Sequence, residues 1–217
     1  FTAFAVGGVA NAINIIDGFN GLTAGVALIM LGAFGLIARQ VGDIALAFTC
    51  LVIAASVAGF FVVNWPRGKI FLGDGGAYFL GFALAWIAVL LPERNASVSP
   101  WSSLLICIYP IAEVVMSFVR KSLRPGSHPS QPDAVHLHML ANRRWAKKLW
   151  PNASLTTQNG LTAPLLWLYT LLPCSAAVFF YTSFLATLGA LVVSFVFYLL
   201  MYHKLAFFRG LPRGKQD

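Results

Sequence analysis

The chain has 217 residues, of which 59% are hydrophobic and only 10% are charged. Soluble domains usually carry about 25% charged residues, so this composition excludes an ordinary water-soluble protein and indicates an integral membrane protein. The formal net charge of +8 is typical of loops that face anionic lipid, and we expect membrane lipid and no nucleic acid as a partner. The three cysteines lie inside apolar runs without metal-like spacing.

Apolar runs long enough for transmembrane helices recur along the whole chain. About 20 apolar residues cross a bilayer as a helix, and on that measure the chain holds about seven spans. They are predicted at residues 1–16, 22–38, 44–63, 75–91, 101–119, 161–180 and 183–202. We therefore expect an all-α, polytopic transmembrane bundle that forms one integral-membrane domain over residues 1–217. Because Phe1 is not a methionine and already lies in an apolar run, we also expect a C-terminal fragment whose N-terminal spans are missing.

Positive charge is distributed unevenly between the two sets of loops. Of the 15 lysines and arginines, only Arg39 and Arg94 fall on one side, and all the others fall on the opposite side. The side rich in lysine and arginine is cytoplasmic by the positive-inside rule. The sequence thus predicts a multi-pass membrane protein with its polar clusters facing the cytoplasm.

Residues 120–160 form a long basic segment on that predicted cytoplasmic side. Within it, residues 140–150 have the pattern of an amphipathic helix, with Arg143, Arg144, Lys147 and Lys148 on one face. Such a helix lies in the membrane interface with its basic face toward phosphates. Simple membrane anchoring and recruitment of an anionic head group both remain open, and Arg143 is a candidate substrate-binding residue.

The first polar cluster interrupts an apolar stretch at residues 11–22. Asn11, Asn14 and Asp17 recur every three residues and share one helical face, and glycines at 18 and 21 then permit a turn. An ionised Asp costs roughly 2.5–3.5 kcal/mol at the bilayer centre and less near an interface. A bound cation or a polar substrate would offset that cost, and a merely capped helix end is the alternative.

The second polar cluster lies at a predicted loop-to-span junction. Asp74 is flanked by glycines, among them Gly73, within Phe71-Leu-Gly-Asp-Gly-Gly-Ala-Tyr78. Glycine lets the backbone approach a ligand closely, and the amides that open a helix favour anions such as phosphate. The alternative is that Asp74 only caps the following helix.

The third polar cluster contains Asp133, His136 and His138. Two histidines at i and i+2 point the same way in extended or loop structure, so they are expected to converge on one group; solvated loop histidines are the alternative. Glu113, three residues after Pro110, is an acid within a predicted span. Such an acid is a functional candidate by default, although a structural pairing inside the bundle is equally compatible with its position.

The chemistry of these ligands indicates a magnesium-dependent phosphate site. Carboxylate and amide oxygens without thiolates suit Mg²⁺ or Mn²⁺. Mg²⁺ typically takes one or two protein ligands and leaves the other positions to water and substrate phosphates. We expect Mg²⁺ as the cofactor, with Mn²⁺ as the substitute.

The polar clusters, taken in this order, resemble the polyprenyl-phosphate N-acetylhexosamine-1-phosphate transferases of glycosyltransferase family 4. The stretches that carry the resemblance are Asn14-Ile-Ile-Asp-Gly-Phe-Asn-Gly-Leu22, Phe71-Leu-Gly-Asp74, Pro110-Ile-Ala-Glu113 and Asp133-Ala-Val-His-Leu-His138. The resemblance implies a bundle of about ten spans, of which about seven are present here. It also implies transfer of an N-acetylhexosamine 1-phosphate from a UDP-sugar to undecaprenyl phosphate with release of UMP, which initiates an envelope polysaccharide such as the O-antigen of lipopolysaccharide.

Site roles follow from the resemblance position by position. Asn14 and Asp74 match metal-binding positions, Asp17 and Asn20 match positions that line the nucleotide-sugar site, and the two histidines match a motif that contacts the donor. The candidate catalytic residues are accordingly Asp74, Asp17, His136 and His138. The candidate substrate-binding residues are Asn11, Asn20, Gly73, Glu113, Asp133 and Arg143.

The chain departs from the family pattern in three respects. The paired aspartates of an early cytoplasmic loop are expected upstream of Phe1, Met139 replaces a common third histidine, and Glu113 stands where many relatives have Asp. Two alternatives are a phospho-N-acetylmuramoyl-pentapeptide transferase and a membrane transporter. His136-Leu-His138 favours the O-antigen type over the pentapeptide enzymes, which carry consecutive histidines. An inactive relative and a homodimer are left open.

Overall fold

The computed structural model of the protein describes residues 2–122 and 135–207, and the secondary structure within these ranges is entirely helical. Seven helices form the body of the bundle: α1 (Thr2–Ile16), α2 (Leu22–Gln40), α3 (Ile44–Asn64), α4 (Gly73–Arg94), α6 (Ile108–Ser122), α9 (Leu155–Phe180) and α10 (Phe184–Ala206). Shorter helical segments are α5 (Pro100–Ile106), α7 (Leu137–Ala141), the π-helical turn η1 (Asn142–Ala146) and α8 (Lys147–Leu149).

The predicted fold class is confirmed, since the described residues form an all-α bundle with several helices of membrane-spanning length. Helices α2, α3, α4, α9 and α10 are each long and apolar enough to cross a bilayer, and the α5–α6 pair makes a sixth candidate. Residues 1–16, predicted as the last part of a span, form α1, whose 15 residues are fewer than a full crossing needs. The protein is therefore a multi-pass helical membrane protein.

The span predicted at residues 101–119 is broken in the structure. Helices α5 and α6 meet at Cys107 with a bend of 74°. A proline ring clashes with the carbonyl of the residue four positions earlier, and for Pro110 that residue is Ile106, the last residue of α5. The Ile106 carbonyl instead accepts a weak hydrogen bond from Cys174 Sγ of α9 at 3.8 Å.

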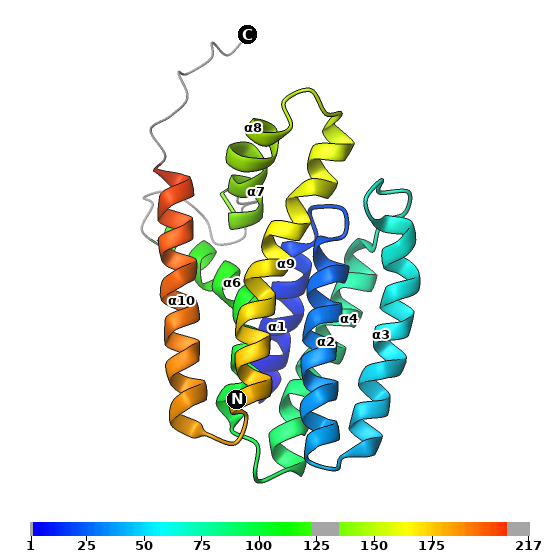
Figure 1. The fold of residues 1–217 in the computed structure, drawn as a ribbon, viewed down its shortest axis with the longest axis vertical. Coiled ribbons are helices and arrows are strands. Elements are labelled where there is room, and N and C mark those ends of the chain that lie inside the picture. Colours follow the sequence, from blue (N-terminus) through cyan, green and yellow to red (C-terminus); the bar gives the residue numbers. More distant parts are fainter. Residues whose placement is uncertain (1, 123–134, 208–217) are drawn as a thin grey trace.

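Figure 1 shows that the helices run alternately up and down, so that the polar clusters gather at one end of the bundle. The turn at residues 17–21, the loop at residues 65–72 and the α7–α8 segment all lie there, and we call this the polar end (Figure 1). At the opposite end, Asp43 accepts a hydrogen bond from Arg94 at 3.0 Å and ties the α2–α3 turn to the end of α4.

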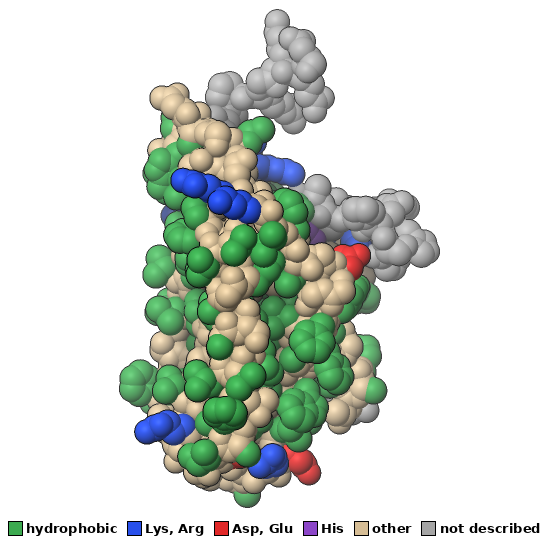
Figure 2. Space-filling model, turned by 90° about the vertical axis from the view of Figure 1, so that its right-hand side faces the viewer, with side chains coloured by type: hydrophobic (Ala, Val, Ile, Leu, Met, Phe, Trp, Pro, Cys, Tyr) green, Lys and Arg blue, Asp and Glu red, His purple; other side chains and the backbone are tan. Residues whose placement is uncertain are grey.

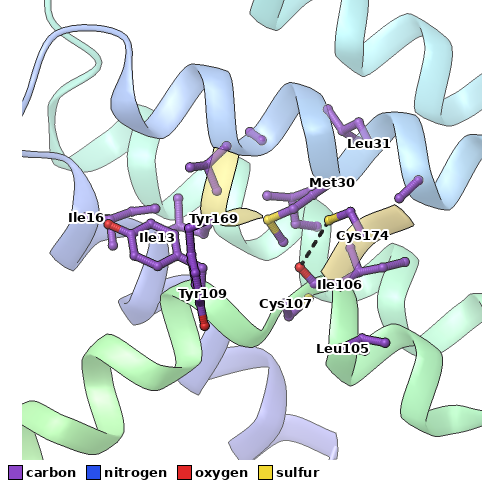
Figure 3. Close-up of a cluster of buried hydrophobic side chains, with 14 of the residues drawn as sticks. Ile13, Ile16, Met30, Leu31, Leu105, Ile106, Cys107, Tyr109, Tyr169 and Cys174 are labelled. Atoms are coloured by element: carbon purple, nitrogen blue, oxygen red, sulfur yellow. Dashed lines mark hydrogen bonds between the residues drawn. The ribbon is translucent and has the colours of Figure 1, made fainter. Parts of the chain in front are cut away.

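A continuous apolar core joins the helices below the polar end. Helix α1 packs against α4 and α6, and α2 packs between α3 and α9. Figure 3 shows the centre of this core, where Tyr109 of α6 and Tyr169 of α9 meet edge to face with their ring centroids 5.7 Å apart. Side chains of α1, α2 and α5 fill the space around them (Figure 3).

The outer surface of the bundle is also apolar. The most hydrophobic windows of α3 and α10 are each only 11% buried, and hydrophobic side chains cover the middle of the face in Figure 2, while lysine and arginine appear only toward its two ends. Such a surface is expected to be covered by the lipid bilayer, because exposure of an apolar patch of this size to water is unfavourable.

Close packing of α1 on α4 depends on Gly81. A Cβ atom at Gly81 would lie 2.7 Å from Ala10 Cα and 2.9 Å from the Ala10 carbonyl oxygen, so that backbone would have to move. We expect Gly81→Ala to lower the free energy of unfolding by about 1–3 kcal/mol, as overpacking of a core does. The measurement is thermal unfolding of the detergent-solubilised protein. Gly59→Ala is the matched control, because nothing lies within 4 Å of a Cβ there, and equal melting temperatures for the two variants would contradict the prediction.

Candidate active site

Two residues that are far apart in sequence meet at the polar end. Asn14 Nδ2, near the end of α1, donates a hydrogen bond of 3.1 Å to Asp74 Oδ1, in the first turn of α4. Gly73 precedes Asp74 with φ +67°, a left-handed conformation that glycine adopts at low cost. The Asp74 side chain is exposed, and α4 has no side-chain hydrogen bond at its cap. In the structure Asp74 therefore pairs with Asn14 and does not act as a simple helix cap.

Asp17 begins the turn that links α1 to α2, close to the same carboxylate. Burial raises the pKa of Asp17, and the negative charge of Asp74 adds to this increase. A second carboxylate close to Asp17 makes this a region where a cation or a hydrogen-bond donor is stabilised.

The raised pKa predicts how stability depends on pH. Folded Asp17 holds its proton more tightly than the unfolded chain does, so its contribution to stability is full in acid and is lost as the pH rises through its folded pKa. We expect Asp17→Asn to melt at a higher temperature than the native protein at neutral pH, with the difference vanishing in acid. Asp43→Asn is the control, since it loses an ion pair and gains no stability. A lower neutral melting temperature for Asp17→Asn would refute this prediction.

The turn at residues 17–21 is fixed by hydrogen bonds from two other segments. Asn64 Oδ1 accepts from the Gly21 amide at 2.6 Å, and Asn64 Nδ2 donates to the Ile70 carbonyl at 2.7 Å. Asn159 Oδ1 accepts from the Asn20 amide at 2.6 Å. The buried Asn20 side chain donates to the Pro66 carbonyl at 3.2 Å. Asn20, predicted to bind substrate, thus also joins the turn to the loop at residues 65–72.

Two tryptophans complete this support. Trp167 Nε1 of α9 donates to the Gly21 carbonyl at 3.1 Å, and Trp65 Nε1 donates to the Gly160 carbonyl at 2.9 Å. The two indole rings meet edge to face at 5.3 Å. These tryptophans and the two asparagines at 64 and 159 were missed by the sequence reasoning, because nothing in their local sequence signals which distant backbone groups they pair with.

The histidines and Glu113 form a buried cluster beside the turn. His136 Nδ1 lies 3.1 Å from Glu113 Oε2, and His138 Nδ1 lies 3.5 Å from Glu113 Oε1. The imidazole rings are parallel, with an interplanar angle of 2° and centroids 5.4 Å apart. The group that both histidines approach in the structure is the Glu113 carboxylate, and their convergence on a substrate phosphate stays a prediction. They are buried and not solvated, although His138 lies in α7 and only His136 has extended backbone geometry.

His138 connects this cluster to the first one. Its Nε2 lies 3.5 Å from where a Cβ atom at Gly18 would stand, and the Phe19 ring meets its ring edge to face at 5.5 Å. Among the described residues, neither of its ring nitrogens has a hydrogen-bond partner. The structure thus places Asp74, Asp17 and His138 around one turn of the chain.

Two further predicted site residues, Asn11 and Arg143, lie on α1 and on η1. Asn11 is exposed on α1, one turn before Asn14, and Arg143 is exposed on η1. Asp133 lies outside the described residues. The expected helix at residues 140–150 is helical as far as Leu149, but η1 widens it, and the apolar Leu149 is 61% exposed. Its insertion in the membrane interface stays a prediction.

The oxygen donors present fit a magnesium ion better than a transition metal. No group of three or more His, Cys, Asp or Glu side chains within residues 2–122 and 135–207 could form a closed metal cage. Asp74 and the Asn14 amide are the residues that would supply the one or two oxygen ligands that Mg²⁺ takes when substrate phosphates supply the others. Because Asn14 now donates through Nδ2, its amide would have to turn its oxygen toward the ion.

The fold and the assembled groups define a class: a multi-pass helical protein with acid, amide and imidazole groups gathered at one end of its bundle. Sequence comparison is more specific. Residues 1–92 match the sequence model of a family described as glycosyl transferase family 4, and this match, with the relatives below, confirms the resemblance drawn from the motifs.

Relatives with related names occur in diverse bacteria. The chain is 33% identical over 147 residues to the undecaprenyl-phosphate alpha-N-acetylglucosaminyl 1-phosphate transferases of Yersinia pestis and Escherichia coli K12, covering 65% of this chain and 40% of each relative. It is 33% identical over 139 residues to a probable undecaprenyl-phosphate N-acetylglucosaminyl 1-phosphate transferase of Bacillus subtilis, covering 63% of this chain and 38% of the relative. The matched region thus spans about 40% of the length of these relatives.

Proposed function

We propose that the protein is a polyprenyl-phosphate sugar-1-phosphate transferase. In the specific form of the proposal, it moves an N-acetylhexosamine 1-phosphate from a UDP-sugar to undecaprenyl phosphate and releases UMP. The observation that carries the proposal is the meeting of Asn14, Asp74 and the Asp17 turn with His138, groups drawn from three separate segments of the chain. The names of the relatives support undecaprenyl phosphate as the acceptor.

The proposed reaction is a phosphoryl transfer at the membrane surface. An oxygen of the acceptor phosphate attacks the phosphorus that bears the sugar, a new P–O bond forms, and the bond to UMP breaks. Catalysis of such a transfer is mainly positioning and electrostatic stabilisation of the charge on the transferring oxygens. The protein therefore needs cationic and hydrogen-bonding groups around the diphosphate more than it needs a nucleophile of its own.

Each part of the site has a role in this proposal. Asp74 and Asn14 would hold Mg²⁺, which when bound stabilises negative charge on the phosphate oxygens. Asp17, whose pKa is raised, is suited to accept a hydrogen bond from a hydroxyl group of the donor sugar-nucleotide. His136 and His138 lie beside the same turn, and their ring nitrogens would accept hydrogen bonds from hydroxyl groups of the donor.

The location of the site supports a lipid-linked acceptor. The polar end lies where the apolar flank of the bundle meets water, so an isoprenoid chain in the bilayer can present its phosphate there (Figure 2). With the positive-inside rule, we infer that this end faces the cytoplasm of a bacterial inner membrane, where UDP-sugars are made. An initiating role in O-antigen or a similar envelope polysaccharide is part of the same proposal.

The test is a reconstituted assay with the full-length protein, undecaprenyl phosphate, Mg²⁺ and UDP-N-acetylglucosamine. Formation of a lipid-linked sugar diphosphate with equimolar UMP is the expected result, and EDTA should abolish it. Release of UDP in place of UMP would show transfer of the sugar alone and would overturn the proposal. UDP-N-acetylgalactosamine and UDP-N-acetylmuramoyl-pentapeptide, offered separately, identify which donor the site accepts.

A further inference from the structure

Glu113 lies in the candidate site, but its carboxylate is fully buried and contacts other residues of the protein. Its exposed fraction is 0%, and both of its oxygens accept from the Leu137 amide, at 3.1 and 3.2 Å. Leu137 is the first residue of α7, and the His136 side chain makes no cap hydrogen bond there. Glu113 of α6 thus caps a short helix that begins on a different segment. A carboxylate is stabilised by amides at such a helix start.

The same carboxylate determines which histidine nitrogen carries a proton. An ionised carboxylate only accepts hydrogen bonds, so an unprotonated Nδ1 lone pair 3.1 Å from Glu113 Oε2 would be repelled. His136 is therefore favoured with its proton on Nδ1. His138 Nδ1, at 3.5 Å from Glu113 Oε1, is favoured in the same form.

Fixing the proton on Nδ1 leaves Nε2 of each ring free to serve the site. Nε2 lies across the ring from Nδ1, and in His138 it faces the Gly18 turn, next to Asp17. Because both rings present Nδ1 to the same carboxylate, Nε2 of each ring is directed away from Glu113. In metal sites, partners of this kind orient histidine ligands, and their loss typically costs 10–100-fold in affinity or activity.

We propose that Glu113 is a positioning residue: it holds His136 and His138 in the Nδ1-protonated form, directs Nε2 of His138 at the turn carrying Asp17, and does not itself touch the substrate. This assignment differs from the substrate-binding role predicted from the sequence. It rests on the proposed function only for its effect on turnover, since the protonation pattern is a property of the protein alone.

The test is ¹⁵N NMR of histidine-labelled full-length protein in lipid bilayers, which distinguishes protonated from unprotonated ring nitrogens. The native protein should show Nδ1–H for His136 and His138, assigned by single His→Gln variants. Glu113→Gln, which replaces one acceptor oxygen with an amide donor, should shift at least one ring toward Nε2–H. Glu113→Asp keeps a carboxylate and should retain the native pattern. Glu93→Gln, the same change on an exposed residue at the opposite end, is the matched control.

The spectra and the turnover assay separate the two proposals. Glu113→Gln should lower kcat by roughly 10- to 100-fold, and Glu113→Asp should recover a large part of it. Native Nε2–H histidines, or a Glu113→Gln spectrum identical to the native one, would overturn the positioning role. If the spectra change as expected while the native protein fails to release UMP, the proposed function falls and the positioning role stands.

Discussion

Asp74→Asn is expected to reduce turnover by several orders of magnitude while leaving the bundle folded. The substitution keeps the size of the side chain and its reach toward Asn14, but removes the negative charge that would hold Mg²⁺. Metal stabilisation of charge on the phosphate oxygens is worth several kcal/mol, and each 1.36 kcal/mol added to a barrier lowers the rate about tenfold. The measurement is UMP release at saturating UDP-sugar over a series of Mg²⁺ concentrations.

The comparison variant for this experiment is Asp43→Asn, the same chemical change at the opposite end of the bundle. It breaks the contact with Arg94, so we expect a small loss of stability and unchanged kcat. Asn14→Ala should be intermediate, with activity that recovers as Mg²⁺ is raised, because it removes a neutral ligand and keeps the charge. Normal turnover by Asp74→Asn at low Mg²⁺ would eliminate the metal assignment.

The sequence was sufficient to predict the bundle because a membrane-spanning helix is recognised from the hydrophobicity of its own residues. The five long helices begin and end within six residues of their predicted bounds. The largest shift is at α9, which begins at Leu155 after Ser154 accepts a hydrogen bond from the Thr157 amide. The break at Cys107 could also have been read from Pro110, since the clash with the carbonyl four residues earlier is a local effect. It was missed because hydropathy alone does not register it.

The candidate site was only partly predictable, for a different reason. Asp17, Asp74 and the two histidines stand out as polar residues in apolar surroundings, and their side of the bundle follows from counting crossings. The partner of each group depends on tertiary geometry. Glu113 is an example. Its sequence position indicated only an acid in a predicted span. Its capping of α7 depends on the bend between α5 and α6 and on the approach of α7 to α6, which are tertiary features.

The second large effect is expected at Asn64, where no catalytic role is proposed. Its buried amide pairs with the Gly21 N–H and with the Ile70 carbonyl, so it holds the Asp17 turn against the loop that precedes Asp74. Asn64→Ala leaves the buried Gly21 N–H without its acceptor, which costs roughly 1–3 kcal/mol. Asn64→Asp keeps an acceptor for Gly21 and loses only the bond to Ile70, so a smaller loss is expected.

Because the two segments joined by Asn64 carry Asp17 and Asp74, its removal should lower turnover as well as stability. A displacement of about 1 Å in a positioned group can cost on the order of 10²-fold in rate. Thermal inactivation half-life and kcat at low temperature, where the variant stays folded, measure the two effects separately. Asn95→Ala is the matched control: Asn95 bonds the Leu91 carbonyl at the opposite end, at 2.9 Å, so stability should fall there without a change in kcat. If Asn64→Ala lost stability but kept native kcat at low temperature, the turn would not need this support to hold its carboxylate, and the site would be organised by Asn14 and Asp74 alone.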